Sequence, residues 1–192
     1  MISKGRPGRF VADPLNRALD AANEEKILIL INRMIQRQNK LQFAAQSGLN
    51  RVTLYRGFSA GGAPKFETVL KALNAFSLQL QCSPRTTGQS SPKEHLRMTA
   101  AVLSDALATN DLEVISRAFG ETVHAQANIA EFSRRVSISR KSLYRWFQAG
   151  NGLKFRSVLK ITSALGLRLE VTWRSDVTTP RSIRSTARKK VG

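Results

Sequence analysis

Hydrophobic side chains recur at helical spacing in two separate parts of the chain. The first stripe follows Asn23 and two glutamates, a typical helix beginning because asparagine caps the first turn and acids favour a helix N-terminus. This spacing predicts a helix over roughly 23–38, and a second stripe after Asp111 predicts another. The two stripes are Ile27, Leu30, Ile31, Met34 and Ile35, and Leu112, Ile115, Phe119 and Val123.

The chain contains an internal repeat with an offset of 89 residues. Positions 41–82 align with positions 130–171 without a gap, and 16 of those 42 pairs are identical. The match continues upstream after an adjustment of a single residue. The same fold is therefore expected twice. Aligned pairs include Phe43 with Phe132, Leu54-Tyr55-Arg56 with Leu143-Tyr144-Arg145, and, upstream, Leu15, Ala18 and Leu19 with Leu103, Ala106 and Leu107.

Each repeat contains the spacing of a helix-turn-helix. In the first, 41–46 forms a short helical stretch, Ser47-Gly48-Leu49 a turn, and Asn50 a cap for a helix over 51–58. In the second, the short helix spans 129–135, the turn 136–138, and Ser139 caps a helix over 140–148. Leu54 with Phe58, and Leu143 with Phe147, are four apart and are expected to face inward.

The second helix of each pair is the candidate recognition helix. Its exposed N-terminal positions carry arginine, which binds guanine bidentately, and side chains whose methyl groups contact thymine. A surface helix can carry two arginines and a serine for no such reason, but a matched pair in the same register favours DNA recognition. The candidate residues are Asn50, Arg51, Val52, Thr53 and Arg56, and Ser139, Arg140, Lys141, Ser142 and Arg145.

A further helix and a strand complete each repeat. The helix carries Phe66 and Leu70 in one copy and Phe155 and Leu159 in the other, and Pro64 suits its first turn. Alternation at 78–82 and 167–173 predicts two strands. Since a lone strand has no ladder partner, we expect the two to pair antiparallel. The predicted fold is mainly α-helical, with two tandem units joined by this pair.

These patterns divide the chain into five segments. A basic N-terminal arm occupies 1–14, the first repeat 15–83, a linker rich in serine, threonine and proline 84–98, the second repeat 99–173, and a basic disordered tail 174–192.

The charge balance points to a polyanionic partner. Lysine and arginine total 31 against 13 acids, for a net charge of +18, and both halves are basic: +8 for 1–92 and +10 for 93–192. A solvated surface is the alternative, but arginine recurs inside the predicted helices as well as in the tails. One cysteine, Cys82, excludes an intramolecular disulfide. With no apolar run long enough for a membrane span and no secretory signal, we expect a soluble, cytoplasmic, nucleoid-associated protein.

The second repeat resembles the HigA-like antidote (antitoxin) family of bacterial toxin-antitoxin modules, a lambda-repressor-like, Xre-type helix-turn-helix group. The resemblance is carried by 139–145 with its Leu-Tyr-Arg triplet, the glycine-rich turn, Lys-Phe-x-x-Val-Leu-Lys at 154–160 and Leu-Gly-Leu-Arg-Leu-Glu-Val at 165–171. Members typically carry one unit and dimerise through the last strand. The resemblance therefore implies a tandem duplication, working as a monomeric pseudo-dimer or as a homodimer of whole chains.

The resulting hypothesis is a sequence-specific regulator of transcription, a repressor in the first instance. Because Arg51-Val52-Thr53 differs from Arg140-Lys141-Ser142, its operator on double-stranded DNA should be an imperfect inverted repeat. Two alternatives stay open: an antitoxin that neutralises a small toxin, and a nonspecific architectural nucleoid protein. No P-loop, dinucleotide motif or triad is present, so no enzyme, cofactor or metal is predicted, and His95 and His124 stand apart from metal-binding partners.

Both ends of the chain carry basic residues outside the repeats. Lys4, Arg6 and Arg9 surround a Gly-Arg-Pro tripeptide that resembles the core of an AT-hook, which lies in the minor groove. Because the match is only a tripeptide, a disordered basic leader is the preferred interpretation. The basic residues of the tail fit nonspecific phosphate contact. They are Arg181, Arg184, Arg188, Lys189 and Lys190.

Overall fold

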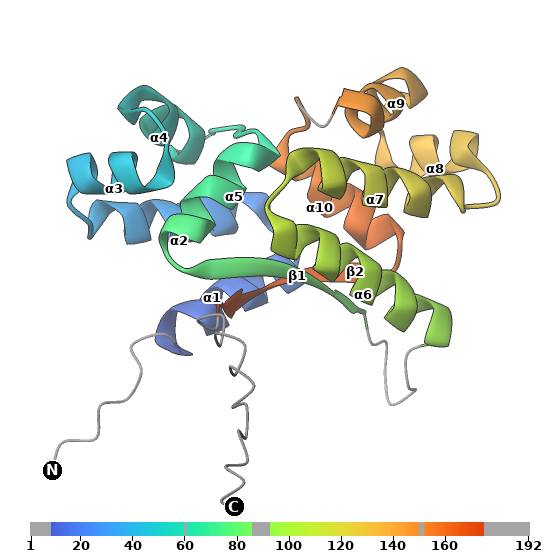
Figure 1. Ribbon diagram of the computed structural model, residues 1–192, viewed down its shortest axis with the longest axis horizontal. Coiled ribbons are helices and arrows are strands. Elements are labelled where there is room, and N and C mark those ends of the chain that lie inside the picture. The colour runs from blue at the N-terminus through green and yellow to red at the C-terminus, as the bar shows by residue number, and fades with distance from the viewer. Residues whose placement is uncertain (1–8, 60, 86–92, 150–151, 175–192) are drawn as a thin grey trace, which may run out of the picture.

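The computed structural model describes residues 9–59, 61–85, 93–149 and 152–174, and it contains the same set of elements twice (Figure 1). The first repeat comprises α1 (Arg9–Asp20), α2 (Glu24–Gln36), α3 (Lys40–Ser47), α4 (Arg51–Phe58), α5 (Phe66–Ala75) and β1 (Leu78–Pro84). The second comprises α6 (Glu94–Thr109), α7 (Leu112–His124), α8 (Ile129–Val136), α9 (Arg140–Ala149), α10 (Phe155–Ala164) and β2 (Leu167–Trp173).

The predicted helix caps and turns are confirmed. The side chains of Asn23, Asn50 and Asp111 accept hydrogen bonds from the first turns of α2, α4 and α7. Gly48 ends α3 in the left-handed conformation, at φ 64°. Pro64 lies before α5 and not in its first turn, because the extended Lys65 is the residue that precedes the helix.

Two helices extend beyond the predicted segments. α1 begins at Arg9, inside the segment expected to be an arm, and α6 begins at Glu94, inside the segment expected to be a linker. Both are stabilised by burial that the local sequence does not reveal: Leu15, Leu103 and Leu107 lie at 1% exposure or less. Their apolar faces pack against the strands.

The two strands pair antiparallel, as predicted, and their register defines a pseudo-two-fold axis. Gln81 lies opposite Glu170, and these residues occupy the same position in the two repeats. An isolated bridge joins Lys65 to Lys154, another pair of equivalent positions. Phe66 N–H donates to the carbonyl of Leu153, and Phe155 N–H donates to that of Pro64. Equivalent residues therefore meet at two places along a single axis.

The first helix of each repeat packs on the strand of the other repeat. Asn16 of α1 accepts a hydrogen bond from Val171 N–H of β2 at 2.7 Å and donates to the Val171 carbonyl at 3.1 Å. Ser104 of α6 does the same for Cys82 of β1, at 2.9 and 3.0 Å. These side chains satisfy the free edge of each strand, where an unpaired backbone group would be costly.

A single core runs through both repeats. Alternate residues of β1 and β2 face it and are buried, and the rings of Phe66 and Phe155 stack across the axis with centroids 6.5 Å apart. Cys82 belongs to this core, where burial and the nearby charge of Glu170 raise the pKa of its thiol to about 12. Because the thiol stays protonated, Cys82 is a packing residue and not a nucleophile.

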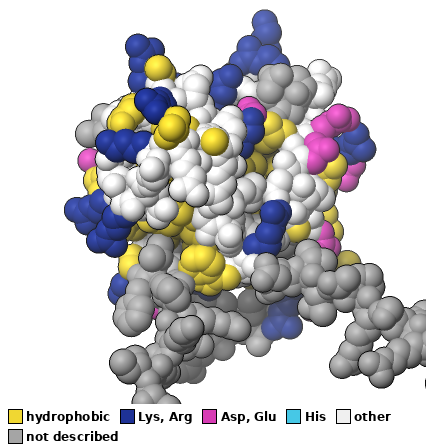
Figure 2. Space-filling view, turned by 60° about the vertical axis from the view of Figure 1, so that its left-hand side comes forward, with side chains coloured by type: hydrophobic (Ala, Val, Ile, Leu, Met, Phe, Trp, Pro, Cys, Tyr) yellow, Lys and Arg dark blue, Asp and Glu magenta, His cyan; other side chains and the backbone are white. Residues whose placement is uncertain are grey.

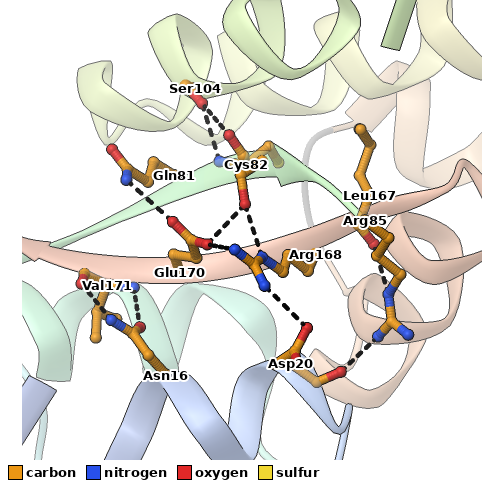
Figure 3. Close-up of polar contacts among 11 residues, drawn as sticks. Asn16, Asp20, Gln81, Cys82, Arg85, Ser104, Leu167, Arg168, Glu170 and Val171 are labelled. Carbon is orange, nitrogen blue, oxygen red and sulfur yellow. Dashed lines mark hydrogen bonds and ion pairs between the residues drawn. The ribbon is translucent and has the colours of Figure 1, made fainter. Parts of the chain in front are cut away.

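The opposite face of the strand pair carries a polar network that links the repeats (Figure 3). Ser83 of β1 donates to Glu170 of β2 at 2.7 Å, and Arg168 forms an ion pair with Glu170 at 2.7 Å. Arg168 also reaches Asp20 at the end of α1, at 3.4 Å. Together with the shared core, these contacts fix the mutual orientation of the two repeats.

Candidate nucleic-acid interface

The candidate recognition helices lie at the two ends of one side of the molecule. In Figure 1, α4 and α9 occupy the upper left and upper right, whereas β1 and β2 cross the lower half. The pseudo-two-fold axis runs between the two helices, because the strand pair and the bridge at Lys65 and Lys154 both lie on it. The helices are therefore related as in a symmetric dimer, although one chain supplies both.

The helix α4 is anchored by its inner face and leaves its predicted binding residues accessible. Leu54 and Phe58 are buried, as predicted. Arg51, Val52 and Arg56 are exposed, and Thr53 is half-buried. Asn50 is also exposed, although its side-chain oxygen is engaged by the backbone N–H of Thr53 at 2.7 Å. The cap holds the helix N-terminus in position, and the N-terminus presents the arginine.

The helix α9 has the same outer face but a different inner one. Leu143 is buried as predicted, but Phe147 is only half-buried, and Trp146 is buried in its place at 2% exposure. Trp146 contacts Phe119 at a centroid distance of 5.4 Å. Phe147 lies over Gly120 of α7, where a methyl group would come within 3.0 Å of its ring carbon. Phe147 therefore faces inward and packs against the core, as expected, although it is not fully buried.

The predicted binding residues of α9 are also accessible. Arg140, Lys141 and Arg145 are exposed and Ser142 is half-buried. Ser139 accepts a hydrogen bond from Ser142 N–H at 3.2 Å, which confirms its predicted role as the cap. None of the five lysines and arginines predicted on α4 and α9 forms an ion pair with a residue that the structure describes. Their charges are available to a ligand.

The segments that contain these helices have no acidic residues. Residues 26–66 contain seven bases and no acid, and residues 132–169 contain nine bases and no acid. Figure 2 shows basic side chains projecting from the upper edge of the molecule, the side that holds α4 and α9 in Figure 1. Acidic side chains gather mainly at the right of that view. Such a distribution creates a positive potential over one side of the protein.

Two lysines on the axis and a small cleft extend this surface beyond the predicted residues. Lys65 and Lys154 are exposed between the helices. A cleft of about 300 Å³ beside α9 is lined by Ser139, Ser142, Arg145, Lys154 and Ser157, among others. Sequence analysis missed both lysines as candidates. Their recurrence in the Lys-Phe dipeptide of both repeats was visible, but only the strand register places them on the axis.

Exposed tyrosines were also missed. Tyr55 is 50% exposed on α4 and Tyr144 is 38% exposed on α9. The ammonium group of Lys40 lies 5.5 Å from the Tyr55 ring centroid, and His124 lies 5.3 Å from the Tyr144 ring. Both belong to the Leu-Tyr-Arg triplet, which marked the repeat but had not been interpreted as binding chemistry. They widen the accessible face of each helix.

The predicted contacts at the chain ends fall mostly outside the described residues. Arg9 is the first residue of α1, so the chain is helical from that residue onward. Lys4 and Arg6, and the basic tail residues Arg181, Arg184, Arg188, Lys189 and Lys190, lie outside the residues that the structure describes.

Across residues 9–59, 61–85, 93–149 and 152–174, no group of three or more histidine, cysteine, aspartate or glutamate side chains is arranged to hold a metal ion. In the same ranges, no helix combines the length and the apolar character that crossing a membrane requires.

The fold defines the chain as a tandem helix-turn-helix protein whose two units share one core. It belongs to the family described as "probable addiction module antidote protein", which matches it twice, over residues 7–84 and 91–173. An uncharacterized protein of Haemophilus influenzae is 37% identical over 67 residues, which are 35% of this chain and 69% of that protein. This relative therefore has about half the length of the chain. No solved structure matches.

Proposed function

We propose that the protein is a sequence-specific DNA-binding regulator of transcription, acting as a repressor and reading an imperfect inverted repeat with α4 and α9. The observation that carries this proposal is the placement of two arginine-bearing helix N-termini on one side, in segments without acidic residues and related by the pseudo-two-fold axis. A two-fold axis between recognition helices matches the pseudo-symmetry of an inverted repeat in DNA. Within the antidote family, this mode of binding supports placing the protein in the HigA-like, Xre-type subgroup.

The side chains divide into two roles in this proposal. Arg51 and Arg140, at the first positions of their helices, reach base edges in successive major grooves. Lys65 and Lys154 contact phosphates between the half-sites, because the axis places them at the centre of the surface. The cleft beside α9 combines hydroxyl groups with two bases and has room for a backbone phosphate.

Footprinting after selection from a random DNA pool tests the proposal. A regulator protects one discrete site made of two related half-sites and prefers it over random DNA by a factor of roughly 10³ or more. A ratio near one, with affinity that falls steeply with salt, would instead assign the protein to architectural nucleoid binding, which its charge of +18 also allows.

Two single variants test the division of roles. Arg140→Ala should lower affinity for the selected site by roughly 10- to 100-fold and relax base preference at one position. Lys154→Ala should weaken every sequence alike and reduce the salt slope by about 1. Identical behaviour of the two variants would contradict the assignment of base reader and phosphate contact.

A second candidate function is neutralisation of a toxin, and the family description favours it. A protein described as an antidote implies a toxin as partner. Co-expression with the product of a neighbouring small gene, followed by purification on a tagged chain, tests this function. A stable complex that relieves growth arrest supports an antidote, and it is compatible with DNA binding because the lower side of Figure 1 lies away from α4 and α9.

A further inference from the structure

A cleft of about 660 Å³ lies between the two repeats, away from the axis. One wall is the beginning of α2 in the first repeat, with Glu24 and Glu25. The other wall is formed by α8 and α10 of the second repeat, including Arg135, Arg156 and Lys160. Its volume falls in the range of roughly 300–1,000 Å³ that is typical of small-molecule sites.

The symmetry of the molecule breaks at this cleft. At the equivalent place on the other side of the axis, Asn74 donates a hydrogen bond to Asn110 at 2.7 Å and ties the two repeats together. On the cleft side the equivalent residues are Ser163 and Ala22, which line the opening. Their side chains are too short to form such a bond. The cleft is thus open where its counterpart is closed.

An ion pair in the lining of the cleft is also absent from the counterpart. Glu24 forms an ion pair with Arg156 across the repeats, and its side chain is only 10% exposed. Its Oε1 is buried without a hydrogen-bond partner in the part of the chain that the structure describes. A buried carboxylate oxygen in that state is costly and is usually explained by function or a missing partner. The equivalent residues are Leu112 and Glu67, which cannot form this pair.

The remaining charges in the lining have both signs. Arg135 and Lys160 carry positive charges and Glu25 a negative one, and none of the three forms an ion pair with a residue that the structure describes. A ligand with a carboxylate for the two bases and an ammonium group for the glutamate complements this lining. These two groups together are the chemistry of a free α-amino acid.

We propose that this cleft binds a free amino acid and that its occupancy changes the affinity of the protein for DNA. Val136 and Ser137, which end α8 and begin the turn to α9, form part of the lining. A ligand held between this turn and α2 couples the position of α9 to the first repeat. Binding then has different free energies in the arrangements that fit DNA and those that do not. The regulatory half of this inference rests on the proposed DNA-binding function, but the ligand site does not.

Thermal unfolding with each standard amino acid in turn tests the ligand site. At about a hundredfold excess over Kd, a bound amino acid should raise Tm by roughly 5–10 °C. The double variant Ala22→Asn/Ser163→Asn rebuilds the closure of the other side and should abolish this shift. Asparagine suits position 22, because Ala22 has φ 47° and the equivalent Asn110 has φ 56°. If no standard amino acid raises Tm, the site is refuted.

A matched pair of single variants separates binding in this cleft from binding elsewhere. Lys160→Ala should weaken binding of the amino acid to the cleft by roughly tenfold. Lys71→Ala is the control, because Lys71 is the equivalent residue of the closed side and pairs with Glu67 at 2.6 Å. Equal effects of the two variants would overturn the assignment of the ligand to this cleft. So would a rise in Tm with the amino acid that stays the same in the double variant.

Mobility shift with the selected operator tests the regulatory half. The amino acid should change the operator Kd of the natural chain by roughly 5-fold or more and leave that of the double variant unchanged. An unchanged Kd in both refutes the coupling. Failure of both proteins to bind DNA, with the thermal shift intact, would overturn the DNA-binding proposal and the coupling but leave the ligand site standing.

Discussion

The two repeats agree at their shared axis and differ on their outer helices. At the axis, equivalent residues pair with each other, as in Gln81 with Glu170 and Phe66 with Phe155. On the outer helices, Val52 and Thr53 of α4 correspond to Lys141 and Ser142 of α9. The comparison teaches that positions on the axis are constrained to meet their own equivalents, whereas exposed residues of the same backbone are free to diverge.

The inner faces of α4 and α9 differ as well. Each helix must be anchored to the core, and the two repeats do this with different side chains. Gly57 packs near Pro64 and Thr68 in the first repeat, and the equivalent Trp146 is buried against Phe119 in the second. Both arrangements leave the first turn of the helix exposed. The position of the candidate recognition helix is therefore retained while the packing behind it changes.

The largest expected effect tests whether the halves form one folding unit. Phe66→Ala and Phe155→Ala each remove a ring that is at most 1% exposed at the axis, and each should lower the free energy of unfolding by roughly 3–5 kcal/mol. Because the core is shared, urea unfolding followed by circular dichroism, which reports on the helices of both repeats, should show a single transition in both variants. Two separate transitions would mean that the repeats fold independently.

The next effect concerns the divergence of the candidate recognition helices. The double variant Val52→Lys/Thr53→Ser gives α4 the first-turn residues of α9. Selection from random DNA should then yield a more symmetric inverted repeat, with a gain of roughly 1–3 kcal/mol for the symmetric over the natural site. The reciprocal change, Lys141→Val/Ser142→Thr, is the control. It should also yield a symmetric operator, but one in which both half-sites resemble the half-site bound by α4. An unchanged operator in both would mean that these positions do not contact bases.

A smaller effect tests the exchange of the first helices between repeats. Asn16→Ala removes two hydrogen bonds to Val171 and leaves part-buried backbone groups unpaired, which should cost roughly 1–3 kcal/mol. Ser104→Ala should cost a similar amount, because it removes the two hydrogen bonds to the backbone of Cys82. Thermal unfolding measures both, and Gln36→Ala at an exposed position of α2 is a control expected to change little. A negligible cost at both strand edges would contradict their role in joining the repeats.

The sequence alone was sufficient for those parts of the fold that depend on local chemistry. Asn50, Asp111 and Gly48 determine where helices begin and end through contacts within a few residues. The duplication then justified pairing the strands. By contrast, the packing of α1 on β2 depends on contacts such as Asn16 with Val171, which are 155 residues apart and leave no local signal.

The candidate site was predictable in part for the same reason. Arg51 and Arg140 could be found because a capped helix after a turn presents its first residues to solvent. Lys65 and Lys154 could not, since their position between the helices follows only from the register of the whole dimer-like unit. The cleft at Ala22 and Ser163 was invisible too, because it arises where two segments distant in sequence fail to close.

The smallest expected effect compares the turns before the candidate recognition helices. Gly48 and Ser137 occupy the same left-handed position, at φ 64° and 54°. Serine is strained there whereas glycine is not, so Ser137→Gly should stabilise the protein by roughly 0.5–1 kcal/mol, and Gly48→Ser should destabilise it by a similar amount. Urea unfolding of the two variants and of the double exchange measures this difference. Because both positions lie outside the proposed base contacts, operator affinity should stay within about twofold, and a larger loss in Ser137→Gly would show that the conformation of this turn itself sets the position of α9.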